Sequence, residues 1–354
     1  MARLYGISNS NRTGDDLWGK NQFNSSFPAS LLCYMGDNFI KPVYVNVDQQ
    51  KVVNTEIDIV DLFNLSKPET GLYFDFESTY PPYNHLCYDN LGKIDLVIRE
   101  CDIDGNPGRY LRPLEVKLTV IPDNTTYKRD ESDWSSELVI RPASTSWATL
   151  GILNSCQPHW PEIRKIFEPV GSTVQSWDNK SEILSIRKDL LKGLSNFYQN
   201  FHHLQQPFLV QPIWKTEGKS PTLSEDCFDV FVWSDFALCK TFIDRANEGS
   251  ELVVSRYLRS AARMFRVIYE VSRVGKVNIE SIYSQMTFNL QTDKEFALSG
   301  MNTLPYLPTT RREHPIMNQG VLKQIVLDDG YRKLSPERRF DASIFFASEK
   351  LFGK

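Results

Sequence analysis

The chain has 354 residues, 41% of them hydrophobic and 24% charged, with 40 basic against 44 acidic side chains. This composition excludes wholesale disorder, a collagen-like repeat and a small disulfide scaffold, and the length suits one large domain or two modest ones. The formal net charge of −4 excludes a uniformly basic protein that coats nucleic acid, but it leaves room for a local basic surface.

Targeting segments and metal-binding cysteine pairs are not expected. The N-terminal residues are polar, and no apolar run approaches the roughly 20 residues that span a bilayer. The six cysteines are scattered, without the Cys-x-x-Cys pairs that indicate zinc. We therefore expect a cytoplasmic protein with reduced thiols and no membrane partner.

Apolar, β-branched runs alternate with stretches of helical periodicity along the chain. Helices are expected at 29–35 and at 55–65, the second capped by Asn54 or Thr55. Strands are then predicted at 93–99, 114–121, 137–142, 208–214 and 229–233, and helices at 181–204, 236–246 and 251–286. Strands mixed with helices, together with one clear hairpin, predict an α/β protein with a mixed sheet.

The segment 93–121 is expected to form that hairpin, because a run of turn residues separates two apolar strands. A turn folded about Gly105 pairs residues whose numbers sum to about 210, which sets Asp95 opposite Glu115. A shift of the turn by two or three residues changes this pairing. Directly opposed side chains have Cβ atoms ~4.5–5.5 Å apart.

Asp95, Glu115 and Lys117 have the chemistry of a metal-dependent hydrolytic site. Two carboxylates so close repel each other unless a cation or a proton lies between them. Their oxygens suit Mg²⁺, which acidifies a bound water and neutralises charge on a phosphate. Lys117 shares the face of Glu115, whereas Val116 faces the opposite side. A nearby cation lowers the pKa of Lys117, which then positions or deprotonates the attacking water.

The triplet Glu115-Val116-Lys117 is set apart by its place in an apolar strand. Two other Asp/Glu-x-Lys triplets, 178–180 and 217–219, lie among loop-forming residues. In this context the chain resembles the PD-(D/E)xK nuclease superfamily, with Asp95 as the first acidic residue and Ile94 in place of the usual proline. The alternative is an ordinary surface ion pair between one of these carboxylates and a nearby lysine or arginine.

A closer resemblance extends over most of the chain. The segments 18–28, 114–119 and 137–142 together resemble the HindVP/HgiDI-type type II restriction endonucleases. The resemblance implies a restriction-endonuclease-like core, a mixed central sheet flanked by helices, with additional helical segments. It also implies one nuclease domain over residues 1–354, with the catalytic core at about 50–240 and a helical, loop-rich region at 241–354 that contributes to DNA binding.

The same resemblance implies Mg²⁺ held by Asp95, Glu115 and the backbone carbonyl of Val116. Its expected activity is double-strand cleavage of DNA at a short palindrome, with GRCGYC as the family's site. A two-fold symmetric homodimer is the natural reader of such a site. Two alternatives stay open: a DNA repair or recombination nuclease on the same core, and a DNA-binding protein with a degenerate, inactive core.

Three further residues are candidates for supporting the site. Glu56 is a possible third carboxylate, although a solvated helix face is the favoured interpretation. Glu137 and Arg141 lie four residues apart on a predicted strand and so share a face, where Arg141 is a candidate contact for the scissile phosphate. A cross-strand salt bridge explains this pair equally well.

A basic helical face is the candidate DNA contact. Arg256, Arg259, Arg263 and Arg266 recur at helical spacing. From Arg256 to Lys276 the chain has six basic residues and one acidic residue. An ordinary solvated face usually interleaves acids with bases, so this pattern favours a helix that follows DNA phosphates.

Overall fold

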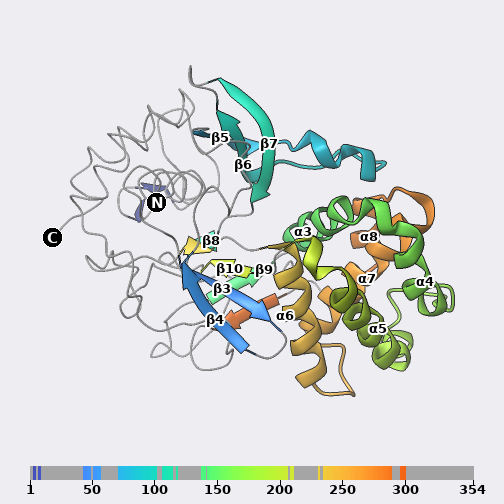
Figure 1. The fold of residues 1–354 in the computed structure, drawn as a ribbon. Helices are drawn as coiled ribbons and strands as arrows, with labels where there is room; N and C mark the ends of the chain where they lie inside the picture. Colours follow the sequence, from blue (N-terminus) through green and yellow to red (C-terminus); the bar gives the residue numbers. More distant parts are fainter. Residues whose placement is uncertain are drawn as a thin grey trace.

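The structure is a computed structural model, and it describes residues 3–4, 7–8, 43–48, 51–56, 71–101, 106–114, 117–118, 137–140, 142–205, 208–210, 230–231, 234–288 and 296–299. In these residues helices predominate, combined with small antiparallel sheets. Figure 1 shows the helices gathered on one side, with strands above and beside them.

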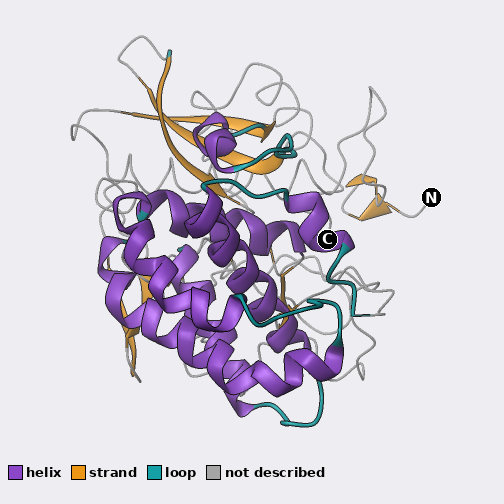
Figure 2. Cartoon of the chain, turned by 90° about the vertical axis from the view of Figure 1, so that its right-hand side faces the viewer, coloured by secondary structure: helices purple, strands orange, loops and turns teal. Residues whose placement is uncertain are grey.

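The largest described sheet element is an antiparallel meander of three strands in the order β5–β6–β7. Its strands are β5 (Gly71–Ser78), β6 (Ile94–Cys101) and β7 (Pro107–Leu114). The short 3₁₀ helix η1 (Pro81–Leu86) connects β5 to β6. Figure 2 shows this sheet lying above the layer of helices.

The other described strands form small antiparallel pairings between distant parts of the chain. β3 (Val43–Asp48) lies between β4 (Lys51–Glu56) and β10 (Phe208–Val210). β8 (Lys117–Leu118) pairs with β11 (Val230–Phe231), β9 (Glu137–Ile140) with β12 (Phe296–Ser299), and β1 (Arg3–Leu4) with β2 (Ile7–Ser8).

The helical layer is built from elements whose ends follow capping rules. It contains α3 (Pro142–Ser155), α4 (Trp160–Gly171), α5 (Lys180–Phe201), α6 (Asp235–Glu248), α7 (Arg256–Val274) and α8 (Ile279–Ser284), with the 3₁₀ helices η2 (Gln157–His159) and η3 (His202–Leu204). The side chains of Asn179, Ser234 and Ser255 accept hydrogen bonds from the first backbone N–H groups of α5, α6 and α7. Gly275, with φ 88°, ends α7 in the left-handed conformation that glycine tolerates best.

An aromatic cluster around Phe265 holds α4, α5 and α7 together. The ring of Phe265 lies 4.5 Å from that of Phe167 and 6.0 Å from that of Trp177, centroid to centroid. Phe167 in turn contacts Phe197 at 5.5 Å. At Gly171 an added Cβ would lie only 2.6 Å from the ring of Tyr269, so the glycine permits α4 and α7 to pack closely. The helical layer is therefore a tightly packed support.

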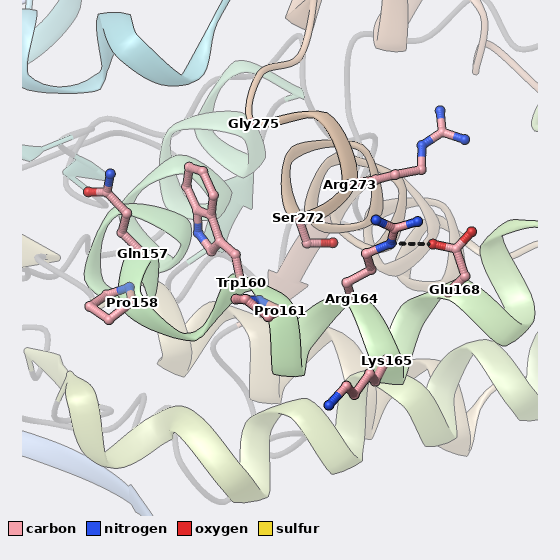
Figure 3. Close-up of a pocket in the computed structure, with 10 residues that line it drawn as sticks. All are labelled: Gln157, Pro158, Trp160, Pro161, Arg164, Lys165, Glu168, Ser272, Arg273 and Gly275. Atoms are coloured by element: carbon pink, nitrogen blue, oxygen red, sulfur yellow. Dashed lines mark hydrogen bonds and ion pairs between the residues drawn. The ribbon is translucent and has the colours of Figure 1, made fainter.

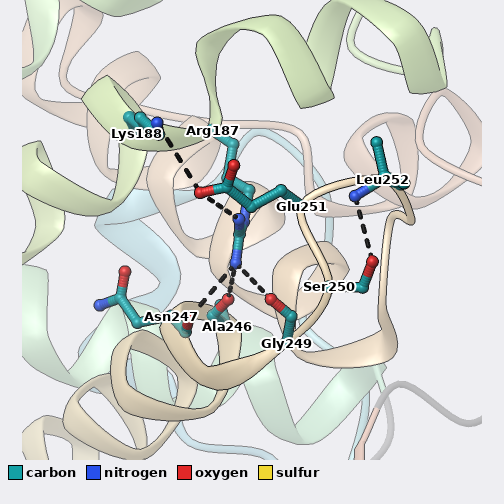
Figure 4. A network of polar contacts seen from close by, with 8 residues as sticks. All are labelled: Arg187, Lys188, Ala246, Asn247, Gly249, Ser250, Glu251 and Leu252. Carbon is teal, nitrogen blue, oxygen red and sulfur yellow. Dashed lines mark hydrogen bonds and ion pairs between the residues drawn. The ribbon is translucent and has the colours of Figure 1, made fainter.

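The buried side chain of Arg187 joins α5 to the end of α6 (Figure 4). Its Nη2 atom donates to the carbonyls of Ala246 at 2.5 Å and Gly249 at 2.8 Å. The carboxylate of Glu251 lies 3.6 Å from Nη1. The last carbonyls of a helix have no intrahelical partners, and this guanidinium donates hydrogen bonds to carbonyls at the end of α6.

The loop after η1 fixes the meander to the helices. Val277 donates its N–H to the carbonyl of Leu86 at 2.9 Å and accepts from the N–H of Tyr88 at 3.0 Å. The carboxylate of Asp89 accepts from the N–H groups of Ile279 and Glu280, both at 3.0 Å, and so caps α8. Two backbone bonds and one cap therefore position the chain that leads directly into β6.

Many of the elements predicted from sequence are confirmed. Strands occur within 93–99, 137–142, 208–214 and 229–233, and helices α5, α6, α7 and α8 cover the predicted helical stretches. The predicted combination of helices and strands is confirmed, whereas the segments 29–35 and 57–65 lie outside the described residues. The helix predicted to begin near Thr55 is wrong at its start, because Thr55 and Glu56 end strand β4, where they pair with β3.

The described elements that were not predicted include the strands β3, β4, β5 and β12 and the helices α3 and α4. The second strand of the hairpin, predicted at 114–121, is β7 at Pro107–Leu114, and of the residues after Leu114 in that range only Lys117–Leu118 are described as a strand. Among the residues that the structure describes, no helix is both long and apolar enough to cross a membrane.

Candidate functional site

The pairing of β6 with β7 has the register that the sequence predicts. Leu96 lies opposite Leu114, and Ile98 lies opposite Arg112, so that the paired residue numbers sum to 210. Nearer the turn the pairing shifts at Arg99, where the strand is irregular. Asp95 precedes Leu96 on β6 and is partly exposed. The regular part of the hairpin is therefore the part next to Asp95.

The three predicted catalytic residues are described to different extents. Asp95 is described in full, on β6. Lys117 begins β8, where its backbone pairs with Phe231 of β11. Glu115 and Val116 lie between β7 and β8, outside the described residues. The catalytic group and its metal ligands thus remain predictions.

A third acidic residue, which sequence reasoning missed, occupies the strand position next to Asp95 on the other neighbouring strand. Phe76 of β5 pairs with Leu96, and Ser78 pairs with Ile94, so the intervening Glu77 occupies the position opposite Asp95. Opposed residues of an antiparallel pair lie on the same face of the sheet. The signal for β5 was present in the sequence, because apolar and polar residues alternate between positions 72 and 77.

An ion pair identifies the polar face of this sheet. Arg99 of β6 lies 3.6 Å from the carboxylate of Asp75 on β5. Its guanidinium also donates to the carbonyl of Gly108 at 2.9 Å and lies 4.3 Å from the ring centroid of Tyr110. Burial raises the pKa of Asp75, and the charge of Arg99 offsets part of that rise. Arg99 and Asp95 are four residues apart on β6, so strand alternation places both on one face of the sheet.

A second ion pair stiffens the same hairpin. Arg109 of β7 donates to Glu100 of β6 at 2.9 Å, and Glu100 is buried. The hydrogen bond that Arg109 donates to the carboxylate of Glu100 raises the pKa of Arg109. Both strands that lead to the predicted catalytic residues are therefore joined by charged cross-strand contacts as well as by backbone bonds.

Asp235, the first residue of α6, lies where β7 meets the helices. Its carboxylate accepts from Nε2 of Gln205 at 2.9 Å, while Oε1 of Gln205 accepts from the N–H of Asp235 at 3.0 Å. Desolvation raises the pKa of Asp235 to about 6, against the lowering effect of the positive charge of Arg112 on β7. Gly151 of α3 lies against this carboxyl group, and any Cβ there would collide with it. This junction ties the start of α6 to α3 and to the residue that follows η3, and the charge of Arg112 acts on it from β7.

The supporting residues are placed apart from this hairpin in the described pairings. Glu56 is the last residue of β4 and pairs with Val43 of β3. Glu137 begins β9 and pairs with Ser299 of β12. Arg141 lies outside the described residues. Their roles stay predictions, and in the described part of the chain no group of three His, Cys, Asp or Glu side chains forms a metal site.

The arginine row of α7 differs from expectation. A helix that contacts DNA phosphates, or a solvated helix face, must expose its arginines. Arg259, Arg263 and Arg266 are only 7–8% exposed. Arg256 is partly exposed. Burial lowers the pKa of Arg263 to about 10. The expected open basic stripe is therefore wrong for three of its four members.

The segment that follows α8 covers this row. Arg263 donates to the carbonyl of Met286 and lies 5.4 Å from the ring centroid of Tyr283. Arg266 donates to Oε1 of Glu270 at 2.8 Å and to the side chain of Gln285. Their contact with DNA phosphates stays a prediction that this burial does not support. The physical reason is tertiary, since the covering residues come from another segment of the chain.

An open groove lies at the opposite end of α7 (Figure 3). It has a volume of about 710 Å³ and is formed by the start of α4, with η2, and the end of α7. Arg164, Lys165 and Arg273 contribute positive charge to its lining, and Glu168 contributes one negative charge. The side chains of Arg164, Lys165 and Arg273 are exposed to solvent.

The comparisons with known proteins agree over nearly the whole chain. The model of the HindVP restriction endonuclease family matches residues 18–352. The chain is 35% identical over 343 residues to the type II restriction enzyme HgiDI of Herpetosiphon aurantiacus, which covers 96% of this chain and 94% of that enzyme. It is 32% identical over 349 residues to the probable type II restriction enzyme HindVP of Haemophilus influenzae, with coverages of 98% and 94%. No solved structure matches the chain.

Proposed function

Because the chain belongs to the HindVP restriction endonuclease family, we propose that it is a type II restriction enzyme that cuts both strands of DNA by metal-dependent hydrolysis at the β6–β7 hairpin. The observation that carries this proposal is the register of the hairpin. Leu96 pairs with Leu114, and the same register, continued by one residue, sets Asp95 opposite Glu115. The finer fold assignment, a restriction-endonuclease-like core within residues 50–240, is part of the proposal.

We propose that Asp95 and Glu115, with the backbone carbonyl of Val116, hold a divalent cation, Mg²⁺ by the chemistry of the ligands. Carboxylate and carbonyl oxygens are the hard ligands that Mg²⁺ prefers. The described register ends at the Leu96–Leu114 pair, and the proposal extends it by one residue to Asp95 and Glu115. When bound, the cation supplies charge neutralisation at the phosphate and an acidified water.

Lys117 is proposed as the residue of this site that interacts with the attacking water. Glu115 and Lys117 are separated by one residue, so an extended strand places both on one face. In its ammonium form Lys117 would donate a hydrogen bond to the attacking water and bring positive charge toward the phosphate, whereas only its neutral amine form would accept the water's proton. In the short β8–β11 pairing, Phe231 supports the backbone of Lys117.

Glu77 is proposed as a third carboxylate of the same site. Its strand position is opposite Asp95, on the side of β6 away from β7. Two neighbouring carboxylates are a poor pair without a cation, because their charges repel. Asp75, two residues earlier on β5, already has an ion-pair partner in Arg99. Asp75 is therefore not proposed as a metal ligand.

The proposed function is tested by the DNA sequence at which the protein cuts. We expect cleavage of long DNA in the presence of Mg²⁺, at GRCGYC-like palindromes, by a homodimer. Guanine O6 and N7 in the major groove favour arginine or lysine readers, and N7 is the acceptor that both purines share at the degenerate positions.

Sequencing of the fragment ends checks this directly. Ends that all fall in one palindromic sequence support the proposal, and omission of Mg²⁺ should abolish them. Ends at unrelated sequences would reject the family site while leaving the nuclease proposal in place. Intact DNA in the presence of Mg²⁺, with a folded protein, would reject the nuclease proposal itself.

A further inference from the structure

The groove between α4 and α7 is held in a fixed shape. The indole N–H of Trp160 donates to the carbonyl of Leu153 at 3.1 Å, which anchors the start of α4 to α3. The ring of Trp160 reaches within 4.0 Å of the position of a Cβ on Gly275, the residue that ends α7. At the far end of α4, Gly171 lies directly against Tyr269 of α7. These contacts fix the two helices that carry the groove's charges.

The charge on the groove is positive and only partly neutralised. Glu168 is the one acidic residue in its lining, and it pairs with Arg164 at 2.9 Å. Within the described residues Lys165 and Arg273 have no carboxylate partner. Figure 3 shows them on either side of the Arg164–Glu168 pair. The chain as a whole has a net charge of −4, so the charge of this groove is opposite in sign to that of the chain.

Two contacts with Tyr269 hold Arg273 in place without pairing it with an acidic group. Its guanidinium donates to the hydroxyl of Tyr269 at 3.4 Å and lies 5.1 Å from the centroid of the same ring. Both contacts orient the cation, and neither partner carries a negative charge. Lys276 lies just beyond Gly275, exposed and 5.9 Å from the ring of Tyr88. Lys276 thus adds one exposed cation next to the end of α7.

The form of the groove points to a polymer rather than to a small molecule. Pockets for small ligands are concave sites that enclose most of the ligand's surface. Here the charged side chains are exposed along an open surface. Exposed cations on an open surface suit the phosphates of a DNA strand, and most protein–DNA hydrogen bonds are to the backbone.

We propose that this groove binds the phosphate backbone of duplex DNA outside the sequence that is cleaved. The proposal rests on the proposed function, since it assigns a second contact region to the same DNA. It also reassigns the DNA contact on α7. Three arginines of the predicted row are buried under the segment after α8, whereas the cations at the other end of the helix are exposed.

The test compares Lys165→Gln/Arg273→Gln with Lys188→Gln/Lys192→Gln, a matched pair of exposed lysines on α5. Binding to a duplex with long flanks is followed by fluorescence anisotropy at several salt concentrations. Two lost phosphate contacts should make the salt slope shallower by about two units, so that the affinity deficit shrinks by about tenfold between 50 and 200 mM salt. The loss should be the same for specific and unrelated sequences and smaller for a duplex that ends near the site.

The α5 control should retain the wild-type slope, and both variants should cut the same sequence as wild type at saturating enzyme. An unchanged slope in Lys165→Gln/Arg273→Gln overturns the proposal. A change in oligomeric state at an unchanged slope also overturns it, because the groove then contacts a second copy of the chain. Failure of the wild-type protein to bind or cut DNA would instead reject the proposed function.

Discussion

Asp95→Asn and Glu115→Gln are each expected to lower the rate of DNA cleavage by about 10³-fold or more. Each change removes a charge that is proposed to hold the cation, and a loss of several kcal/mol of stabilisation corresponds to a tenfold rate change for every ~1.4 kcal/mol. DNA binding in Ca²⁺ should remain, since the substitutions are nearly isosteric. Single-turnover cleavage together with anisotropy measures both quantities.

Glu100→Gln is the matched control for these variants. Glu100 lies on the same strand as Asp95, but it pairs with Arg109 and is buried away from the proposed metal ligands. We expect this variant to lose some stability and to cut DNA at a rate near that of wild type. Near wild-type cleavage by Asp95→Asn or Glu115→Gln would contradict the assigned site.

Glu77→Gln is expected to reduce cleavage by about 10- to 100-fold at low Mg²⁺, the range typical of groups that support a metal site. Its register position opposite Asp95 is the reason. Because the remaining carboxylates still bind the cation, higher Mg²⁺ should restore much of the rate. The rate is measured as a function of Mg²⁺ concentration.

A merely structural role for Glu77 predicts a different result. Loss of packing or of a surface charge would lower the folded fraction at every metal concentration alike. An unchanged Mg²⁺ dependence, whether or not the maximal rate falls, would therefore exclude Glu77 from the metal site. Thermal unfolding of the same variant shows whether its stability has changed.

The hairpin was predictable because its determinants are local. Two apolar strands and one turn fix the pairing of Leu96 with Leu114, and the alternation of side chains then orders the faces. The strand β5 had the same kind of signal in its alternating residues, but its place beside β6 depends on the connection through η1. Glu77 becomes a candidate only once that pairing is known.

The arginine row shows the limit of periodicity as a guide. Arg259, Arg263 and Arg266 do share a helix, as their spacing predicts. Whether such a face is open depends on what packs against it, and here Met286 and neighbouring residues fold back over it. No local property of the sequence between 256 and 276 distinguishes a covered face from an open one. The groove was invisible for the same reason, because α4 and α7 are distant in the chain.

The most direct test of the account is a calorimetric titration of Ca²⁺ into the enzyme–DNA complex. Ca²⁺ uses the same oxygen ligands as Mg²⁺. Wild type and Glu100→Gln should bind the ion saturably, and the heat should disappear in Asp95→Asn and Glu115→Gln. If both variants, with the protein–DNA complex intact, bind Ca²⁺ as wild type does, then Asp95 and Glu115 do not hold the metal.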